Sequence, residues 1–469
     1  MKQREYFFSA VFIFVVLLFS CNKNNFVTSP DAVVYIGSDY ANYNNDTLRF
    51  DTLFTSVLSP TVSFKIFNGN GQKLHIDNLQ LAGGNNSPFM INVNGAPGTQ
   101  FSGLDIDAND SIYVFVSANI PVTTSKNTFQ VLDSIGVQYN GKTMYVKLQA
   151  FGQNAYLLNN KTIASDTVFT NDLPILIYGN LTVAAGASLT INSGARLYFH
   201  GGAGLQVNGS LVANGGFATG NRITMQADRL DYPYSYLPGM WKGINFGANS
   251  SNNVLNYVTI GSAIAGIADT LSAAIPDVMK INLNGCIVGN MSNAGLLLQN
   301  SFLNAVNCLI VNSANNVVVT GGGNYNFEYC TIAGYSNSFV THSPSVQLSN
   351  ESSGGLSGAL NAVFTNTIIY GAFGILNDEI TITKTGNTAF SISMNHVLYK
   401  LSNDISTINF NASVQNQDPQ FVTTNTLQNI YDFHLQAGSP ASGAGTPTGT
   451  LIDIDGSSRS AAPSIGCYE

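Results

Sequence analysis

The sequence predicts an all-β protein: a right-handed, three-sided parallel β-helix preceded by an immunoglobulin-like β-sandwich. Three observations support this prediction. Cys286, Cys308 and Cys330 recur at a step of 22 residues, and leucines recur at a step of eight through residues 181–205. Only 9% of the residues are charged whereas 45% are apolar, so most of the polarity comes from Asn, Ser and Thr. Such a composition is typical of folded β proteins rather than of disordered chains.

The N-terminus predicts an export signal that ends in a lipidated cysteine. Lys2 and Arg4 precede an almost wholly apolar run, residues 7–19, which is shorter than the about 20 residues that span a bilayer. Residues 18–21, Leu-Phe-Ser-Cys, resemble the lipobox of bacterial lipoproteins, in which the cysteine, here Cys21, becomes the acylated N-terminus. The alternative is an ordinary signal peptide with an incidental cysteine. Because more than one acyl chain anchors a protein stably, we expect an outer-membrane lipoprotein, with the leaflet left open.

The charge of the chain restricts its partners. Its formal charge is −8 at pH 7 and becomes −9 when residues 1–21, which include Lys2, Arg4 and Glu5, are removed. An acidic exported protein is repelled by nucleic acids and by anionic lipid headgroups. We therefore expect no nucleic-acid partner, and no residue pattern predicts a cofactor.

Two segments separate the export signal from the solenoid. Residues 22–32 form a polar tether, and residues 33–152 contain short alternating apolar and polar runs with glycine-rich turns between them. This pattern predicts the β-sandwich. The run SFKIFNGNGQKLHIDNLQLAGG resembles bacterial immunoglobulin-like modules related to the ASPM and Hydin group. That resemblance implies a spacer or docking domain without catalytic residues.

The β-helix is predicted over residues 156–435, because a fixed period of this length marks stacked repeats. Leu181, Leu189, Leu197 and Leu205 each precede an apolar residue by two positions, as inward residues of short strands do. Three such sides make about 24 residues, which is close to the cysteine step and describes a three-sided coil.

The residues that keep the step of 22 are predicted to be structural. Cys286, Cys308 and Cys330 would form an inward column of small apolar side chains. The coil spacing of about 4.8 Å is too long for disulfides between them, and no histidine pattern accompanies them as a metal site would require. A second series keeps the same step: Asn293, Asn315 and Asn337. Its side-chain amides would bond from coil to coil as a turn ladder.

Residues 436–469 are predicted to cap the last coil, since a solenoid must cover its terminal apolar layer. Within them, Asp453, Asp455 and Arg459 predict a cap turn with an ion pair. A calcium site at the two aspartates is the alternative, and we predict no bound metal.

Two stretches of the β-helix and the tail resemble a known group. The run GNLTVAAGASLTINSGARLYFHGGAGLQVNGSLVANG, followed by ITMQADRLDYPYSYLPGMWKGINF, is similar to the β-helix lipoproteins of Bacteroidota, part of the pectate-lyase-like solenoid superfamily. The tail, with its Ser-Pro pair, Asp-x-Asp-Gly turn, arginine and terminal Gly-x-Tyr-Glu, resembles the closing segment of that group. Ser442-Gly443 departs from it, because relatives often carry an aspartate there. The resemblance implies the fold and the anchor but no defined activity, since these proteins are mostly uncharacterised.

The sequence offers little for catalysis. Polysaccharide lyases and glycoside hydrolases with this fold need carboxylates and a basic residue grouped on one face, and fold alone does not imply function. Residues 281–350 contain one carboxylate, Glu328, and no Lys or Arg. A lyase or hydrolase acting on extracellular polysaccharide remains the alternative, because such sites can also be assembled from distant loops.

The best candidate for binding is the aromatic segment 228–241. Sugar recognition uses aromatic faces against C–H surfaces, and carboxylates or arginine against hydroxyl groups. The candidate glycan contacts are Asp228, Arg229, Asp231, Tyr232, Tyr234, Tyr236 and Trp241. For Trp241 the alternative is a core position that covers an apolar coil.

These observations predict a lipid-anchored envelope protein that binds or scaffolds without catalysis, with polysaccharide or an envelope protein as its partner. A glycan binder should present an aromatic-floored groove. An enzyme should present a carboxylate cluster with a basic residue on one sheet, and a purely structural protein should present neither.

Overall fold

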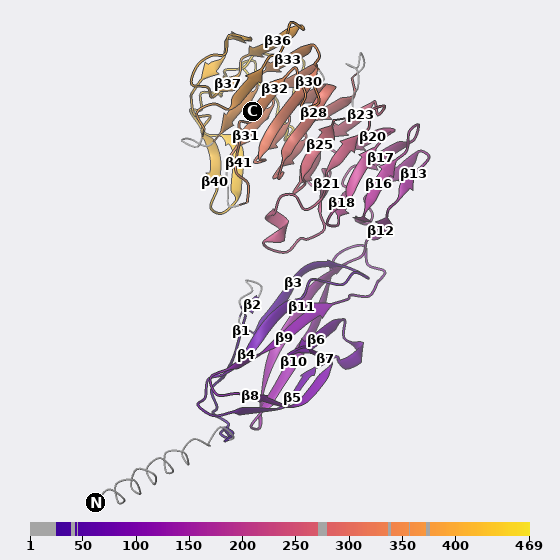
Figure 1. Ribbon diagram of the computed structural model, residues 1–469, viewed down its shortest axis with the longest axis vertical. Coiled ribbons are helices and arrows are strands. Elements are labelled where there is room, and N and C mark those ends of the chain that lie inside the picture. The colour runs from indigo at the N-terminus through magenta and orange to yellow at the C-terminus, as the bar shows by residue number, and fades with distance from the viewer. Residues whose placement is uncertain are drawn as a thin grey trace, which may run out of the picture. The chain divides into compact units, whose positions relative to one another are not determined.

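The computed structural model describes residues 25–38, 43–44, 46–270, 279–335, 339–355, 357–371 and 376–469. Cys21 and Asn337, singled out above, lie outside these residues. The chain divides into two compact units, Met1–Asn154 and Ala155–Glu469, and both are built from strands (Figure 1). Within the described part of the chain, no helix is both long enough and apolar enough to cross a membrane.

The first unit is a pair of sheets whose strands are antiparallel except for β3 and β11. One sheet has the order β1 (Val34–Gly37), β4 (Val62–Asn68), β9 (Ser111–Ala118), β6 (Phe89–Val93) and β7 (Ala96–Gly98). The other has the order β2 (Tyr43–Asn44), β3 (Thr47–Phe54), β11 (Lys142–Gln153), β10 (Phe129–Tyr139), β5 (Leu74–Leu81) and β8 (Gln100–Ile106). A short 3-10 turn, η1 (Gly84–Asn86), precedes β6.

Alternation along the strands explains how this unit folds. In β4 the residues Val62, Phe64 and Ile66 are buried, whereas Ser63 and Lys65 between them are half-buried on the opposite face. Strands with this period bury one face of each sheet in a shared apolar core. The arrangement is compatible with the immunoglobulin-like module that the sequence predicts.

The second unit is a parallel β-helix, which confirms the predicted fold class. One side of it, here called the one-sided sheet, takes a single strand from each coil. Its order is β12 (Tyr156–Asn159), β15 (Ile175–Tyr178), β18 (Arg196–Phe199), β21 (Ile223–Ala227), β24 (Val258–Gly261), β27 (Ile287–Gly289), β29 (Leu309–Val311), β31 (Thr331–Gly334), β34 (Ile368–Gly371), β37 (Leu398–Tyr399) and β39 (Val414–Gln415).

The other two sides form a second parallel sheet, the two-sided sheet. Its strands are β13 (Thr162–Ile163), β14 (Thr167–Phe169), β16 (Asn180–Val183), β17 (Ser188–Asn192), β19 (Gly204–Val207), β20 (Ser210–Asn214), β22 (Ile244–Phe246), β23 (Asn253–Asn256), β25 (Ala265–Asp269), β26 (Ile281–Asn284), β28 (Ala294–Val306), β30 (Asn315–Glu328), β32 (Val346–Ser349), β33 (Leu360–Thr365), β35 (Ile380–Thr383), β36 (Phe390–Asn395) and β38 (Ile408–Asn411). Because β16 pairs with β19 and β17 with β20, each early coil supplies three strands and therefore three sides.

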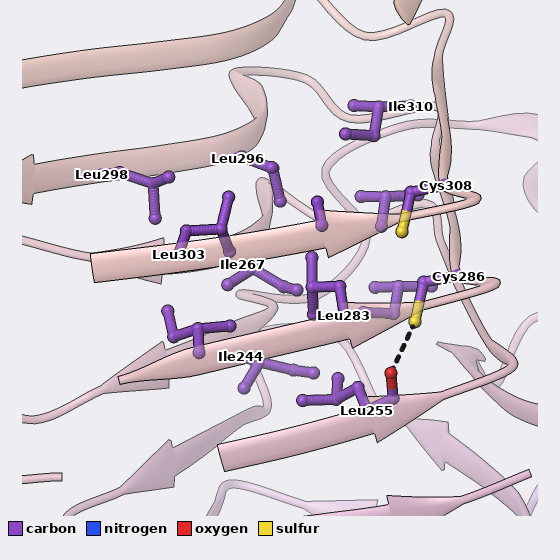
Figure 2. Packing of buried hydrophobic residues seen from close by; sticks show 14 of the residues in the cluster. Ile244, Leu255, Ile267, Leu283, Cys286, Leu296, Leu298, Leu303, Cys308 and Ile310 are labelled. Carbon is purple, nitrogen blue, oxygen red and sulfur yellow. Dashed lines mark hydrogen bonds between the residues drawn. The ribbon is translucent and has the colours of Figure 1, made fainter. Parts of the chain in front are cut away.

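The cysteines lie in the core of this solenoid. Cys286, Cys308 and Cys330 are free and fully buried, and each directly precedes a strand of the one-sided sheet. Figure 2 shows Cys286 and Cys308 at equivalent places on neighbouring coils, with the Cys286 Sγ 3.2 Å from the carbonyl oxygen of Leu255. Burial raises the pKa of the Cys286 and Cys308 thiols well above the usual value.

Two members of the asparagine series, Asn293 and Asn315, lie among the described residues and are bonded from coil to coil. The Asn315 amide donates to the backbone oxygen of Asn293 at 3.0 Å. A ladder between side-chain amides occurs at another series with the same step of 22. It links Asn282, Asn304 and Asn326 at 3.0 and 2.8 Å.

The C-terminal residues, which were predicted to cover the last coil, pack along the flank of the solenoid. A hairpin, β40 (Phe421–Asn425) and β41 (Ile430–Leu435), precedes them. The outer face of the one-sided sheet carries apolar side chains such as Leu309 and Ile368, and these need cover. Phe433 from the hairpin and Ile465 from the tail supply that cover.

Burial predicts how the thiols react. In the protein beginning at Asn22, the thiols of Cys286, Cys308, Cys330 and Cys467 should not react with a thiol reagent at pH 8 until the chain is unfolded, because each is buried. Ellman titration with and without denaturant measures this. Rapid labelling of the native protein would contradict the inward column.

Candidate functional site

A bare strip of backbone lies on the outer face of the one-sided sheet. Gly261 and Gly289 are paired in register at the ends of β24 and β27. Within these strands Ile260 and Val288 point into the core, so the two glycines lie on the outside. Among the described residues, no atom beyond the chain neighbours lies within 4 Å of the position that a Gly261 Cβ would take. At Gly289 that position lies 2.9 Å from the Val311 carbonyl oxygen, so the open space is above Gly261. Ile287, Leu309 and Val311 complete the floor.

Neighbouring segments of the chain extend beyond this floor and form a groove of about 530 Å³. The hairpin β40–β41 and the tail form one wall, and the segment after β21 forms another. The side chains that line the walls include Tyr236, Asn429, Tyr431, Asp432, His434, Asp455 and Tyr468. These residues and the floor are called the groove below. Its volume is in the range of small-molecule sites, about 300–1,000 Å³.

A histidine between two carboxylates ties the hairpin to the tail at the rim of the groove. His434 Nδ1 lies 2.6 Å from Asp432 Oδ1, and its Nε2 lies 3.0 Å from Asp455 Oδ2. All three side chains are nearly half exposed. The ring of Tyr468 lies 3.9 Å from that of His434, centroid to centroid. The rim is therefore ordered before any ligand arrives.

These contacts shift the acid–base properties of the rim. Burial lowers the pKa of His434, but the hydrogen bonds and charges of Asp432 and Asp455 outweigh it and raise the pKa above 6.5. For Asp432, burial raises the pKa, but the backbone N–H and the imidazole of His434 outweigh it and lower the pKa. Asp432 is therefore an ionised acceptor at neutral pH.

The turn at 453–456 is held by hydrogen bonds rather than by the predicted ion pair within it. Asp453 is buried, and its carboxylate accepts from the backbone N–H groups of Asp455, Ser457 and Glu469 at 2.8–3.0 Å. Oxygens that already accept N–H groups are poorly placed to bind calcium. Within the described residues, no group of three or more His, Cys, Asp or Glu side chains is placed to hold a metal ion.

The ion pair of Arg459 is made with the chain terminus. Its Nη1 lies 3.4 Å from Glu469 Oε2, and its Nη2 donates to Asn307 Oδ1 at 2.8 Å. The guanidinium also lies 3.7 Å from the ring centre of Tyr329. Arg459 therefore fastens the tail to the flank of the solenoid.

The residues of the aromatic segment 228–241 differ in their surroundings: some contact other side chains of the protein, some are exposed, and Trp241 is buried. Asp228 binds His200, and Arg229 forms a two-pronged pair with Asp231 at 2.7 Å while stacking over Tyr234 at 3.6 Å. Tyr232 and Tyr236 lie edge to face and are exposed. Only Tyr236 of these residues lines the groove. It belongs to a short 3-10 turn, η2 (Tyr234–Tyr236).

Trp241 is not a glycan contact. Its side chain is fully buried, stacks on Phe199 at 4.0 Å, and donates its Nε1–H to the Gly261 carbonyl at 2.8 Å. A large indole at this position fills the solenoid core, which no sugar can reach. The core alternative considered for this residue is the correct one.

The grouping most like a catalytic centre is closed to substrate. His342 Nε2 lies 2.8 Å from Glu379 Oε2, which also accepts from the Ser345 hydroxyl at 2.9 Å. The His342 and Glu379 side chains are 1% and 0% exposed. Fully buried groups cannot contact a polymer, so His342 and Glu379 are not the exposed carboxylate cluster with a basic residue that a polysaccharide-cleaving enzyme needs.

Most residues of the groove carry no signal that predicts a site from the sequence. Asp432, His434, Tyr431 and Tyr468 were not singled out, because their importance comes from packing against strands more than 100 residues earlier. A local signal did exist. In IYDFHL, residues 430–435, aromatic residues alternate with Asp and His, which is typical of a strand with one apolar and one charged face.

No family model matches the chain, and no curated protein matches it. Among solved structures, a family 123 glycoside hydrolase from Clostridium perfringens aligns at 13% identity over 27% of this chain and 30% of its own, with a TM-score of 0.19. PapD-like domain 7 of human CEP192 aligns at 12% identity over 27% of this chain and 89% of its own, with a TM-score of 0.17. The catalytic unit of a GH87 α-1,3-glucanase from Streptomyces thermodiastaticus aligns at 9% identity over 79% and 92%, with a TM-score of 0.23. These weak likenesses support no inference about activity.

The rim geometry predicts the titration of His434. Its pKa in the folded protein should lie above 6.5, and Asp455→Asn should lower that pKa by removing one negative partner. A raised pKa means that protonation contributes stability below pH 6.5, and that this contribution is lost as pH rises through the folded-state value. NMR titration of the imidazole measures both values, and an unchanged pKa in Asp455→Asn would contradict the contact.

The tail contacts predict a stability loss. Arg459→Met should lower the free energy of unfolding by about 3 kcal/mol, because the part-buried Glu469 and Asn307 lose their partner. The only tryptophan, Trp241, lies in the solenoid core and reports its unfolding in urea by fluorescence. Lys161→Met, which removes an exposed positive charge from the same unit, is the control and should cost less than about 0.5 kcal/mol. Equal effects of the two substitutions would contradict the role of Arg459.

Proposed function

We propose that the groove binds a segment of neutral glycan and that the protein acts in binding rather than catalysis. The proposal is based on a groove that is open above Gly261 and is lined by Tyr236, Tyr431 and Tyr468. Tyr236 is 46% exposed, and Tyr431 and Tyr468 are partly exposed. Aromatic rings around an open floor suit the apolar C–H face of a sugar, and the polar rim suits its hydroxyl groups.

The charge of the rim favours a neutral ligand over an acidic one. Asp432 and Asp455 carry two negative charges, and the protonated fraction of His434 offsets at most one of them. The whole chain is also acidic, with a formal charge of −8. A polyuronate would therefore be repelled both on approach and at the rim.

Catalysis is the second candidate, because two carboxylates face one groove. Against it, the lowered pKa of Asp432 makes this group a poor general acid at neutral pH. Both ring nitrogens of His434 are held by carboxylates and are not available as a free base. Release of new reducing ends or unsaturated product from any polymer would favour the enzyme over the binder.

The sequence supports a place for this activity at the cell envelope. A lipobox-like segment ending at Cys21, a polar tether and a spacer module would hold the β-helix near an outer membrane. The partners would then be the membrane, through the anchor, and a polysaccharide or a glycosylated envelope protein.

Filling the groove tests the proposal. Gly261→Phe places a ring in the open space above the floor, at a residue whose backbone is not in the left-handed region. In affinity electrophoresis against galactomannan, xyloglucan, β-1,3-glucan and polygalacturonate, the wild-type protein should be retarded by at least one neutral polymer and not by polygalacturonate. Gly261→Phe should weaken that retardation by about tenfold.

Gly71→Phe is the matched control, since Gly71 also has open space around it and lies in the other unit. It should bind as the wild type does. Retardation that is equal in Gly261→Phe, or that occurs only with polygalacturonate, would overturn the proposal. Absence of retardation by every polymer would do the same.

A further inference from the structure

One outer face of the first unit is aromatic and exposed. It belongs to the sheet β1–β4–β9–β6–β7, in which outward residues alternate with buried ones along each strand. Tyr35 and Tyr113 on this face are 52% and 41% exposed. The surface, called the aromatic face below, consists of Tyr35, Lys65, Phe67, Met90, Tyr113 and Phe115. Neighbouring exposed apolar side chains of this kind mark an interaction surface.

The aromatic face is almost free of charge. The five strands of its sheet contain one charged residue, Lys65, although the chain as a whole is acidic. The strands of the other sheet carry four carboxylates, Asp51, Asp77, Asp105 and Asp133. Because a carboxylate is costly to remove from water, the aromatic face is the side of the sandwich that an apolar partner can cover at the lower cost.

The rings of this face are packed against one another. Tyr35 stacks on Phe67 at 4.7 Å, and Tyr113 stacks on Phe115 at 5.5 Å. Lys65 Nζ lies 4.7 Å from the ring centre of Tyr113. Rings that cover each other are poorly placed to stack on a sugar, but they can enter an apolar layer as a group. Tyrosine and lysine side chains are typical of the membrane–water interface, where rings enter the headgroup layer and the ammonium group stays near phosphate.

The chain enters the sandwich at the end where this face begins. The backbone N–H of Lys73 donates to Asn25 at 3.2 Å, and that of Val27 donates back to Lys73 at 2.8 Å. Lys73 lies in the connection that follows β4, and Phe67 is the last outward residue of that strand. Cys21 precedes Asn25 by four residues, which span at most about 14 Å when fully extended. An acylated Cys21 would therefore keep this end of the sandwich close to the membrane surface.

We propose that the aromatic face docks on the zwitterionic phospholipid headgroups of the membrane in which Cys21 is anchored. The inference takes the anchor from the proposed function and adds a second membrane contact, which does not depend on a glycan in the groove. An anchor alone fixes one point of the chain, whereas an anchor together with a docked face fixes the orientation of the first unit. A bilayer is favoured over a protein partner because the short link to Cys21 keeps the face near the bilayer in every copy.

Tryptophan quenching by brominated lipid tests this docking. The full chain, purified with its anchor, is reconstituted in vesicles of phosphatidylethanolamine and phosphatidylcholine, with the phosphatidylcholine either plain or brominated in its acyl chains near the headgroup. Tyr113→Trp should lose fluorescence in the brominated vesicles, because its indole would lie in the interface. The wild type supplies the background, since its single tryptophan, Trp241, is buried in the solenoid core.

Two pairs of variants make the test specific. Tyr145→Trp is the matched control for Tyr113→Trp, because Tyr145 is 59% exposed on the other sheet, and it should lose no more fluorescence than the wild type. Added to Tyr113→Trp, Phe115→Asp should abolish the quenching by placing a carboxylate on the face. Tyr145→Asp in the same background should leave the quenching intact. Tyr35→Trp replaces Tyr113→Trp as the reporter if that variant does not fold.

The outcomes separate this docking from the proposed function. Quenching in Tyr113→Trp that is no greater than in Tyr145→Trp would overturn the docking and leave the anchor and the groove standing. A Cys21 without acyl chains, seen by mass spectrometry of the N-terminal peptide, would overturn the anchor and the docking together. A dimer of the protein beginning at Asn22 that Phe115→Asp dissociates would assign the face to a second copy and overturn the docking. Polysaccharide binding is measured without a membrane, so its failure would overturn the groove proposal alone.

Discussion

Backbone hydrogen bonds between consecutive coils set the position of every strand of the solenoid on which the groove is built. The column at the cysteines shows the pattern: the N–H of the residue after each cysteine donates to the preceding coil, as from Leu309 to Cys286 and from Thr331 to Cys308, both at 2.9 Å. A parallel ladder of this kind fixes the spacing of the coils. The inward side chains must then fill a core of nearly constant width, which accounts for small apolar residues recurring at one place.

The same ladder leaves the outward positions free to vary. At one outward position of the one-sided sheet, the residue is glycine in β24 and β27 but apolar in β29 and β34. The apolar part is covered by the hairpin and the tail, and the glycine part is left open. The groove lies at the boundary between these two parts of the sheet face. The hairpin that covers the apolar part therefore also forms one wall of the groove.

The sequence was sufficient for the features that repeat. Strand alternation and the step of 22 led to the β-helix, and the inward cysteines needed no information from distant residues. The groove could not be predicted in this way, because Gly261 and His434 are distant in the sequence and line one cavity only when the hairpin packs on the flank of the solenoid. Trp241 and Tyr236 look alike as aromatic residues in one segment, yet one fills the core and the other lines the groove. Sequence alone does not distinguish them, since the choice depends on which coil lies beneath each ring.

Glycan binding in the groove is tested most directly by hydrogen–deuterium exchange followed by mass spectrometry, with and without each neutral polysaccharide. Binding in the groove should slow exchange in peptides that cover β24, β27 and β41 and leave exchange in the first unit unchanged. Slower exchange confined to the first unit, or no change with any neutral polymer, would contradict a glycan site in the groove.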